Sequence, residues 1–239
     1  MIHKDAGRYE IVAGEYYDPG LHPTCANFRV ASSHFLKGML PAYRGPRGWW
    51  CEVGPGRSLL SEWLDAGGYG LRELVLIDSS PTMLGYSAPW KARGAQLVLG
   101  SAEALPIATG RISLLVASLG DPYNLPSFWA EVARVLRPGG VVLFTTPSYQ
   151  WASSFRDNGE VASMTSAEFL LSDGRKAYMP SFIRPESEQA EMIRECGLQV
   201  GPIVPVPLSA LGDALVSPKV LGLIEPIIVT GYVATKPGF

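Results

Sequence analysis

Short apolar runs alternate with helical patterns along most of this chain. Runs such as residues 74–77 and 141–144 are apolar at every position. Continuous runs of this kind are typical of parallel strands that helices cover on both faces, because a strand with one solvated face would alternate. We predict strands at residues 49–53, 71–77, 95–99, 112–118, 141–146, 198–206 and 226–236. We predict helices at residues 24–40, 58–66, 81–91, 127–136 and 185–196.

The order of these elements predicts an α/β fold with a doubly wound, mostly parallel sheet of seven strands. Two segments lie outside the alternation, residues 1–45 and residues 147–184. A long segment without a crossover helix is more often a functional loop than a plain connection. We therefore expect an N-terminal helical lid at residues 1–45 and a main domain at residues 46–239. Within that domain, residues 147–184 form an insertion after the fifth strand that covers a ligand site.

Composition and charge narrow the range of partners. The chain has 239 residues and a formal net charge of −2. This charge offers no footprint for a nucleic-acid backbone, so we expect no nucleic acid as a partner.

No apolar run approaches a membrane span and the first residues lack a signal segment, so we expect no membrane association. Three cysteines, odd in number and far apart, indicate neither a zinc site nor a disulfide framework. We expect a reduced, cytoplasmic protein.

A glycine-rich turn lies between the first predicted strand and the next helix. Its sequence is Glu52-Val53-Gly54-Pro55-Gly56-Arg57-Ser58. Glycines let the backbone turn sharply and approach a ligand, and the following helix offers free N–H groups to it. The next strand ends at Asp78, 22 residues after Gly56, and an acidic residue about 20 residues on is expected to bind ribose hydroxyls. Alternatively, Asp78 caps the next helix together with Ser79 and Ser80.

Five segments, in this order, resemble the class I S-adenosylmethionine-dependent methyltransferases that act on small molecules. They are EVGPG at 52–56, LIDSSPTML at 76–84, GSAEALP at 100–106, ISLLVAS at 112–118 and VARVLRPGG at 132–140. The resemblance is good over residues 48–147 and looser in the C-terminal strands. It implies the Rossmann-like methyltransferase fold with an antiparallel last strand. It also implies S-adenosylmethionine as cofactor and methyl transfer to a small molecule.

The resemblance further implies which residues bind the cofactor. These residues are Glu52, Gly54, Pro55, Gly56, Asp78, Ser79, Ser101, Ala102, Glu103 and Ser118. Glu52 and the turn would hold the amino-acid end of the cofactor, since a carboxylate suits an ammonium group. Asp78 would hold the ribose. Ser79 and residues 101–103 would lie along the adenine, and Ser118 would lie near the sulfur.

The chain departs from the family pattern at two positions. Ser58 stands where many members have a third glycine, and a serine there fits as a helix N-cap. Ser101 stands where many members have an aspartate that binds the adenine amino group. The competing class with a similar fold is that of NAD(P)-dependent oxidoreductases, which also use glycines and a ribose carboxylate. The additional carboxylate of Glu52 would repel a pyrophosphate and attract an ammonium group, which favours the methyltransferase.

Methyl transfer is an in-line displacement at carbon, so the protein must mainly align the reactants and exclude water. A base is needed if the nucleophile carries a proton that must leave. All three histidines precede the first predicted strand. His22, in a turn-rich loop, is our candidate for a lid-derived base, whereas His34 is better explained as an ordinary helix residue. Tyr16 and Tyr17 can hydrogen-bond the cofactor or pack on its sulfonium, or they can simply pack the lid.

The run Asp121-Pro122-Tyr123-Asn124 follows the fourth predicted strand. It resembles the Asp-Pro-Pro-Tyr motif of amino-group methyltransferases, but it lacks one proline and lies a few residues late. The same run is typical of a plain turn. We keep Asp121 and Tyr123 as catalytic candidates and infer no nitrogen acceptor from the motif. Because Asp121 is the lone carboxylate at this point, we expect no metal.

The aromatic residues of the insertion, such as Tyr178 and Phe182, indicate an organic, partly apolar acceptor. The accepting group stays open among a hydroxyl, an amine and a carboxylate of a small biosynthetic intermediate. Two alternatives also stay open, a non-catalytic protein that keeps the fold for binding or scaffolding and an NAD(P)-dependent oxidoreductase. A homodimer is compatible with the apolar residues near the C-terminus, which are Ile224, Ile227 and Ile228.

Overall fold

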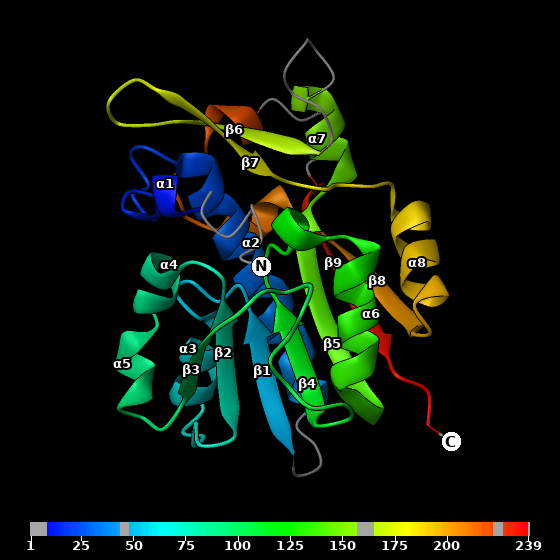
Figure 1. Ribbon diagram of the computed structural model, residues 1–239. Coiled ribbons are helices and arrows are strands. Elements are labelled where there is room, and N and C mark those ends of the chain that lie inside the picture. The colour runs from blue at the N-terminus through cyan, green and yellow to red at the C-terminus, as the bar shows by residue number, and fades with distance from the viewer. Residues whose placement is uncertain (1–8, 44–47, 157–164, 222–226, 239) are drawn as a thin grey trace.

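A computed structural model describes residues 9–43, 48–156, 165–221 and 227–238. Its centre is a seven-stranded sheet in the order β3-β2-β1-β4-β5-β9-β8 (Figure 1). These strands are β1 Trp49–Val53, β2 Leu74–Asp78, β3 Gln96–Leu99, β4 Ile112–Ala117, β5 Leu136–Pro147, β8 Gln199–Pro207 and β9 Ile227–Thr235. Neighbouring strands are parallel except at β9, which is antiparallel to both β5 and β8. The predicted fold class is confirmed, including the antiparallel last strand.

Helices cover both faces of this sheet. The α-helices are α1 Glu10–Ala13, α2 Pro23–Met39, α3 Leu59–Ala66, α4 Pro81–Gly85, α5 Ala88–Lys91, α6 Pro126–Val135, α7 Tyr149–Arg156, α8 Glu186–Glu195 and α9 Pro218–Leu221. The 3-10 helices are η1 Leu40–Tyr43, η2 Asp121–Tyr123 and η3 Leu208–Leu211. In β2, Leu74 and Leu76 pack with α2 and α3, while Val75 and Ile77 belong to the core on the other face, with α6 and α8. The strand is therefore apolar at every position but its last.

Two elements differ from their prediction. The helix predicted at residues 81–91 is two short helices, because Gly85 favours a break and Pro89 has no N–H to continue one long helix. The break is useful locally, since Ser87 Oγ donates to the carbonyl of Gly56 at 2.6 Å. Residues 137–140 fall between the predicted helix at 127–136 and the predicted strand at 141–146. They lie inside β5, as an irregular stretch between Leu136, which pairs with Ile112, and the regular part of the strand.

The insertion after β5 has regular structure that the sequence pattern did not predict. It contains α7 and a hairpin of β6 Ser166–Leu170 and β7 Lys176–Pro180. Phe169 of β6 and Met179 of β7 pack against Val12 of α1 in a small separate core. In Figure 1 the hairpin lies beside α1 above the sheet. We call α1 and this hairpin the roof. Parts of the expected lid and insertion, residues 1–8, 44–45 and 157–164, lie outside the described residues.

The helix predicted from residue 24 to residue 40 is α2, and its apolar face is buried as expected, with Phe28, Phe35 and Leu36 in the core. Phe35 packs on β9 at Gly231, where a Cβ atom would lie 2.4 Å from two atoms of the phenyl ring. The close approach of α2 to the sheet therefore requires glycine at this position.

Three expectations from the sequence concern a membrane span, a metal site and a dimer surface. No helix within the described ranges is long and apolar enough to cross a bilayer. Those same ranges contain no group of three or more His, Cys, Asp or Glu side chains placed to hold a metal ion. Ile228 is fully buried, so it cannot contribute to a dimer surface as we expected, and Ile224 lies outside the described residues. Homodimerisation stays a prediction.

We expect Gly231→Ala to lower the free energy of unfolding by about 1–3 kcal/mol, as overpacked sites do. The cause is the collision with the Phe35 ring, which forces α2 away from β9. Gly38→Ala is the control, because Gly38 lies on α2, the helix that Gly231→Ala would displace, and a Cβ at Gly38 meets nothing within 4 Å. It should stabilise the helix by about 0.5–1 kcal/mol. Urea unfolding followed by tryptophan fluorescence measures both, and equal midpoints would contradict this account.

Candidate active site

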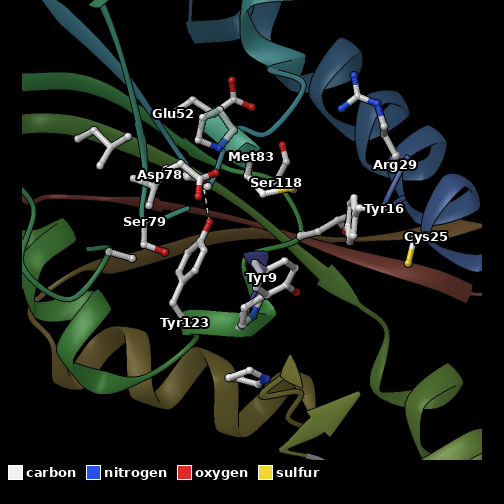
Figure 2. Close-up of a pocket in the computed structure, with 18 of the residues that line it drawn as sticks. Tyr9, Tyr16, Cys25, Arg29, Glu52, Asp78, Ser79, Met83, Ser118 and Tyr123 are labelled. Carbon is white, nitrogen blue, oxygen red and sulfur yellow. Dashed lines mark hydrogen bonds between the residues drawn. The ribbon is translucent and has the colours of Figure 1, made fainter. Parts of the chain in front are cut away.

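A cavity of about 670 Å³ lies where the carboxyl ends of β1, β2 and β4 meet the roof. Ligands of open α/β sheets bind at this edge, because the strands leave a crevice there. The glycine-rich turn, Asp78 and Ser79 line the cavity from the sheet, and residues 101–103 form a wall. Tyr9, Tyr16 and Cys25 line it from the N-terminal segment (Figure 2).

Glu52 is buried near the end of β1 with only one of its carboxylate oxygens satisfied. Oε2 accepts hydrogen bonds from the Ser58 hydroxyl and, at 3.3 Å, from the backbone N–H of Leu60. Oε1 is buried and has no hydrogen-bond partner among the described residues. Burial raises the pKa of Glu52 to about 7. An unsatisfied buried carboxylate oxygen beside a cavity is a ready partner for a positively charged group.

The turn after β1 adopts a backbone that only glycine takes without strain. Gly54 and Gly56 have φ angles of 62° and 45°. A Cβ on Gly56 would lie 1.9 Å from the Tyr17 hydroxyl oxygen. That oxygen accepts the backbone N–H of Arg57 at 2.7 Å, so Tyr17 closes directly on the turn. Ser58 caps α3 as predicted, with its hydroxyl accepting the N–H of Ser61 at 2.9 Å.

Asp78 ends β2 and lines the cavity. Its carboxylate accepts the N–H groups of Ser80, at 3.0 Å, and Gly56, at 3.4 Å. Burial raises its pKa to about 6. The side-chain cap of α4 is Ser80, whose hydroxyl accepts the N–H of Met83 at 3.0 Å. The capping role that competed for Asp78 is therefore taken by its neighbour, and the carboxylate keeps its place beside the cavity.

The segment after β4 brings a strained residue to the cavity. Ser118 lines it with a buried hydroxyl that has no partner among the described residues. Leu119 has a φ of 53°, an uncommon conformation for a non-glycine residue. The N–H of Leu119 donates to Thr145 Oγ1 at 2.8 Å, and that hydroxyl lies 2.6 Å from Ser32 Oγ. Strain held in place in this way is frequent at functional sites.

The predicted catalytic residues do not all reach the cavity. Tyr123 lines it, and its hydroxyl donates to the carbonyl of Val53 at 2.7 Å. Asp121 is buried below, where its carboxylate accepts the Ser181 hydroxyl, and it is not among the lining residues. His22 is also outside the lining. Its Nε2 lies 3.3 Å from Glu15 Oε1, and its ring packs edge-on against Phe169.

Of the other predicted site residues, Gly56 alone is not among the lining residues, and the structure adds some lining residues that we missed. Tyr16, Tyr17, Ser79, Ser101, Ala102 and Glu103 all line it. Phe182 also lines the cavity, whereas Tyr178 is exposed on the hairpin. The missed lining residues include Tyr9, Cys25 and Arg29. Tyr9 makes an edge contact with Tyr16, with ring centroids 6.0 Å apart. The signal available in the sequence was the group of tyrosines that precede the helix predicted at residues 24–40.

Comparison with known proteins agrees with this arrangement. Residues 51–144 match the methyltransferase domain family. A malonyl-[acyl-carrier protein] O-methyltransferase from Pectobacterium atrosepticum is 29% identical over 130 residues, which cover 53% of this chain and 49% of that protein. The chain thus spans about half the length of this relative.

Two solved structures share the fold at low identity. An S-adenosylmethionine-dependent methyltransferase from Clostridium acetobutylicum has a TM-score of 0.65 at 14% identity, over 96% of this chain and 99% of that one. Geranyl diphosphate C-methyltransferase from Streptomyces coelicolor has a TM-score of 0.61 at 15% identity, over 86% of this chain and 78% of that one. Residues 51–144 thus match the methyltransferase domain family, and the fold is shared with these methyltransferase structures.

The residues at the cavity fit the cofactor of this family, S-adenosylmethionine. The unsatisfied Oε1 of Glu52 suits its ammonium group. At Gly54 and Gly56 the turn has no side chain of its own, and the hydroxyl groups of Tyr123 and Tyr17 lie against it, 2.8 Å and 1.9 Å from where a Cβ would be. Asp78 offers a carboxylate at the position where a ribose diol is bound in related folds.

We expect Asp78→Ala to weaken binding of S-adenosylhomocysteine by about 1–3 kcal/mol, the cost of leaving the ribose hydroxyls without a partner. Asp173→Ala, in the exposed turn of the hairpin, is the control and should leave the affinity unchanged. Isothermal titration calorimetry gives both affinities, and circular dichroism checks that each variant is folded. An unchanged affinity in a folded Asp78→Ala protein would remove Asp78 from the site.

The raised pKa values of Glu52 and Asp78 predict a pH-dependent affinity. Cofactor binding favours the ionised carboxylates, so below about pH 7 it must displace a proton. We expect the affinity for S-adenosylhomocysteine to fall from pH 8 to pH 5.5, by up to about tenfold per pH unit for each proton displaced. In the free protein these groups contribute stability at low pH that is lost as the pH rises through about 6 to 7. Glu52→Gln should bind more weakly at pH 8 and show a flatter profile, and a pH-independent wild-type affinity would refute this account.

Proposed function

We propose that this protein transfers the methyl group of S-adenosylmethionine to a hydroxyl, amine or carboxylate of a small organic biosynthetic intermediate. The observation that carries the proposal is that the two sides of one cavity differ in their chemistry. The sheet side presents the buried carboxylates of Glu52 and Asp78 on either side of a glycine turn. The opposite side presents aromatic residues from the N-terminal segment, Tyr9 and Tyr16, and from the segment after β7, Phe182. A cavity of about 670 Å³ is within the range of small-molecule sites and leaves room beside a cofactor.

When bound, S-adenosylmethionine supplies an activated methyl group with a good leaving group. The chain's own contribution is then alignment and exclusion of water. Glu52 and the turn would fix the amino-acid end, and Asp78 would fix the ribose. The position of Ser118 and Leu119 at the end of β4 supports the idea that this segment faces the reacting atoms.

Contacts within the roof support the proposal that the N-terminal segment and the insertion cover the cavity. The Glu15 carboxylate accepts the Ser172 N–H, at 3.1 Å, and the Ser172 hydroxyl, at 2.6 Å, which ties the N-terminal segment to the hairpin. His22 contacts the same Glu15. A role for His22 as a base stays a prediction, and these contacts favour a part in holding the roof. Asp121 and Tyr123 likewise stay candidates, with Tyr123 the nearer to the cavity.

The alternatives make different predictions for ligand binding. An NAD(P)-dependent oxidoreductase would bind a dinucleotide, for which the buried carboxylate of Glu52 is unfavourable. A non-catalytic protein that keeps the fold would bind the cofactor without turnover. A net charge of −2 supports a small acceptor over a nucleic acid.

We expect micromolar binding of S-adenosylhomocysteine and no binding of NAD or NADP in calorimetric titrations. We expect this difference because the cavity fits an ammonium group and a ribose but fits a pyrophosphate poorly. Turnover is then measured by release of labelled methyl product from S-adenosylmethionine with a panel of small acceptors. Tight dinucleotide binding would contradict the proposal. Cofactor binding without turnover on any acceptor would favour the non-catalytic alternative.

A further inference from the structure

Four aromatic rings from three separate segments line the cavity. Tyr9 and Tyr16 come from the N-terminal segment, Tyr123 from η2 and Phe182 from the segment after β7. We call these four residues the aromatic end. In the view of Figure 2, Tyr9 and Tyr16 lie on the side of the pocket away from Asp78. Tyr123 reaches the glycine turn, where its hydroxyl donates to the carbonyl of Val53 at 2.7 Å. The aromatic end therefore borders the residues that would hold the cofactor, and the space beside Tyr9 and Tyr16 is left for the acceptor.

The aromatic end contains no cation that could hold an anionic acceptor. Among the described residues that line the cavity, Arg29 and Arg57 are the cationic side chains. Arg29 donates to Glu62, at 2.6 Å, and to the carbonyl of Arg57, at 2.5 Å. The guanidinium of Arg57 lies 4.6 Å from the ring centroid of Tyr17. A buried carboxylate or phosphate at the aromatic end would thus be left without a partner, which is strongly unfavourable.

The charged groups that act on the phenols of the aromatic end are mainly carboxylates. Burial and then the charge of Asp121 raise the pKa of Tyr9 well above its usual value. Burial and then Asp78, Glu52 and Asp121 do the same for Tyr123. The opposing influence nearby is Lys219, which lowers the pKa of Cys25 against the larger effect of burial. These phenols therefore stay neutral. They can donate hydrogen bonds but cannot take a proton from a nucleophile.

A cavity with ring faces and nearby carboxylates suits a reaction that keeps a positive charge. Aromatic faces attract cations, most strongly where water is excluded. Methylation of an anionic oxygen would cancel the sulfonium charge, and methylation of a neutral hydroxyl would need a base. Methylation of a neutral nitrogen needs neither an anion nor a base in the step itself.

We propose that the acceptor is an uncharged molecule with a planar ring and a neutral nitrogen nucleophile, and that the aromatic end stabilises the cation formed on that nitrogen. This rests on the proposed function. The nitrogen lone pair forms the new N–C bond, while the electron pair of the broken C–S bond stays on sulfur. The positive charge passes from sulfur to nitrogen. If the nitrogen carried a hydrogen, that proton leaves to water afterwards.

The test compares two flat probes of similar size and opposite charge. The full chain is saturated with S-adenosylhomocysteine and titrated with N-methylisoquinolinium, which mimics the cationic product, and with 2-naphthoate. We expect the cation to bind at least about tenfold more tightly, because the rings attract it and the nearby carboxylates repel 2-naphthoate. Equal or tighter binding of 2-naphthoate would overturn the inference, and so would the absence of binding by both probes. If S-adenosylhomocysteine itself fails to bind, it is the proposed function that fails.

Variants of Tyr9 show whether the ring provides the preference. Tyr9→Leu should reduce the ratio of the two affinities by about three- to tenfold, since the aromatic face is lost. Tyr9→Phe keeps the face and should keep the ratio. Tyr178→Leu, on the exposed part of the hairpin, is the control outside the cavity. An unchanged ratio in Tyr9→Leu, or an equal loss in Tyr9→Phe, would overturn the assignment of the ring.

Discussion

The site depends on the parallel pairing of β1 with β2 and β4. In this register Glu52 pairs with Leu76 on one side and Val116 on the other, so the three strands end together. Parallel strands that end together leave their last side chains and the following turns at one edge. This pairing brings the glycine turn, Asp78 and Ser118 to one cavity although they come from three separate parts of the sequence. A shift of β1 by one residue would turn the Glu52 side chain to the other face.

The sheet was predictable because its signal is local and repeated. A continuously buried strand such as β2 needs apolar residues at successive positions, and the intervening helices are marked by their own caps. The residues that the family resemblance implies for the cofactor lie mostly at strand ends, which the same register brings together. Ser58 could be assigned as an N-cap from its position alone, since capping depends on neighbours three residues away.

The roof was not predictable in detail because its stability comes from distant contacts. The β6 sequence Ser166–Leu170 mixes small and charged residues and has weak strand character. Its inward residue Phe169 is buried only because Val12, far away in the sequence, packs against it. Tyr9 was missed for a similar reason, since no periodicity indicates which aromatic ring faces a cavity. For His22, a candidate base was chosen by residue type, and its contacts with Glu15 and Phe169 could not be read from the sequence.

The N-terminal segment is attached directly to the two turns that would hold the cofactor. The Glu10 carboxylate accepts the Ser80 hydroxyl and the Thr82 hydroxyl, each at 2.6 Å, at the start of α4. Tyr17 contacts the glycine turn, while Tyr9 and Tyr16 line the same cavity. One short segment therefore joins the start of α4, the glycine turn and the cavity wall, so a change in the packing of this segment would be transmitted to all three.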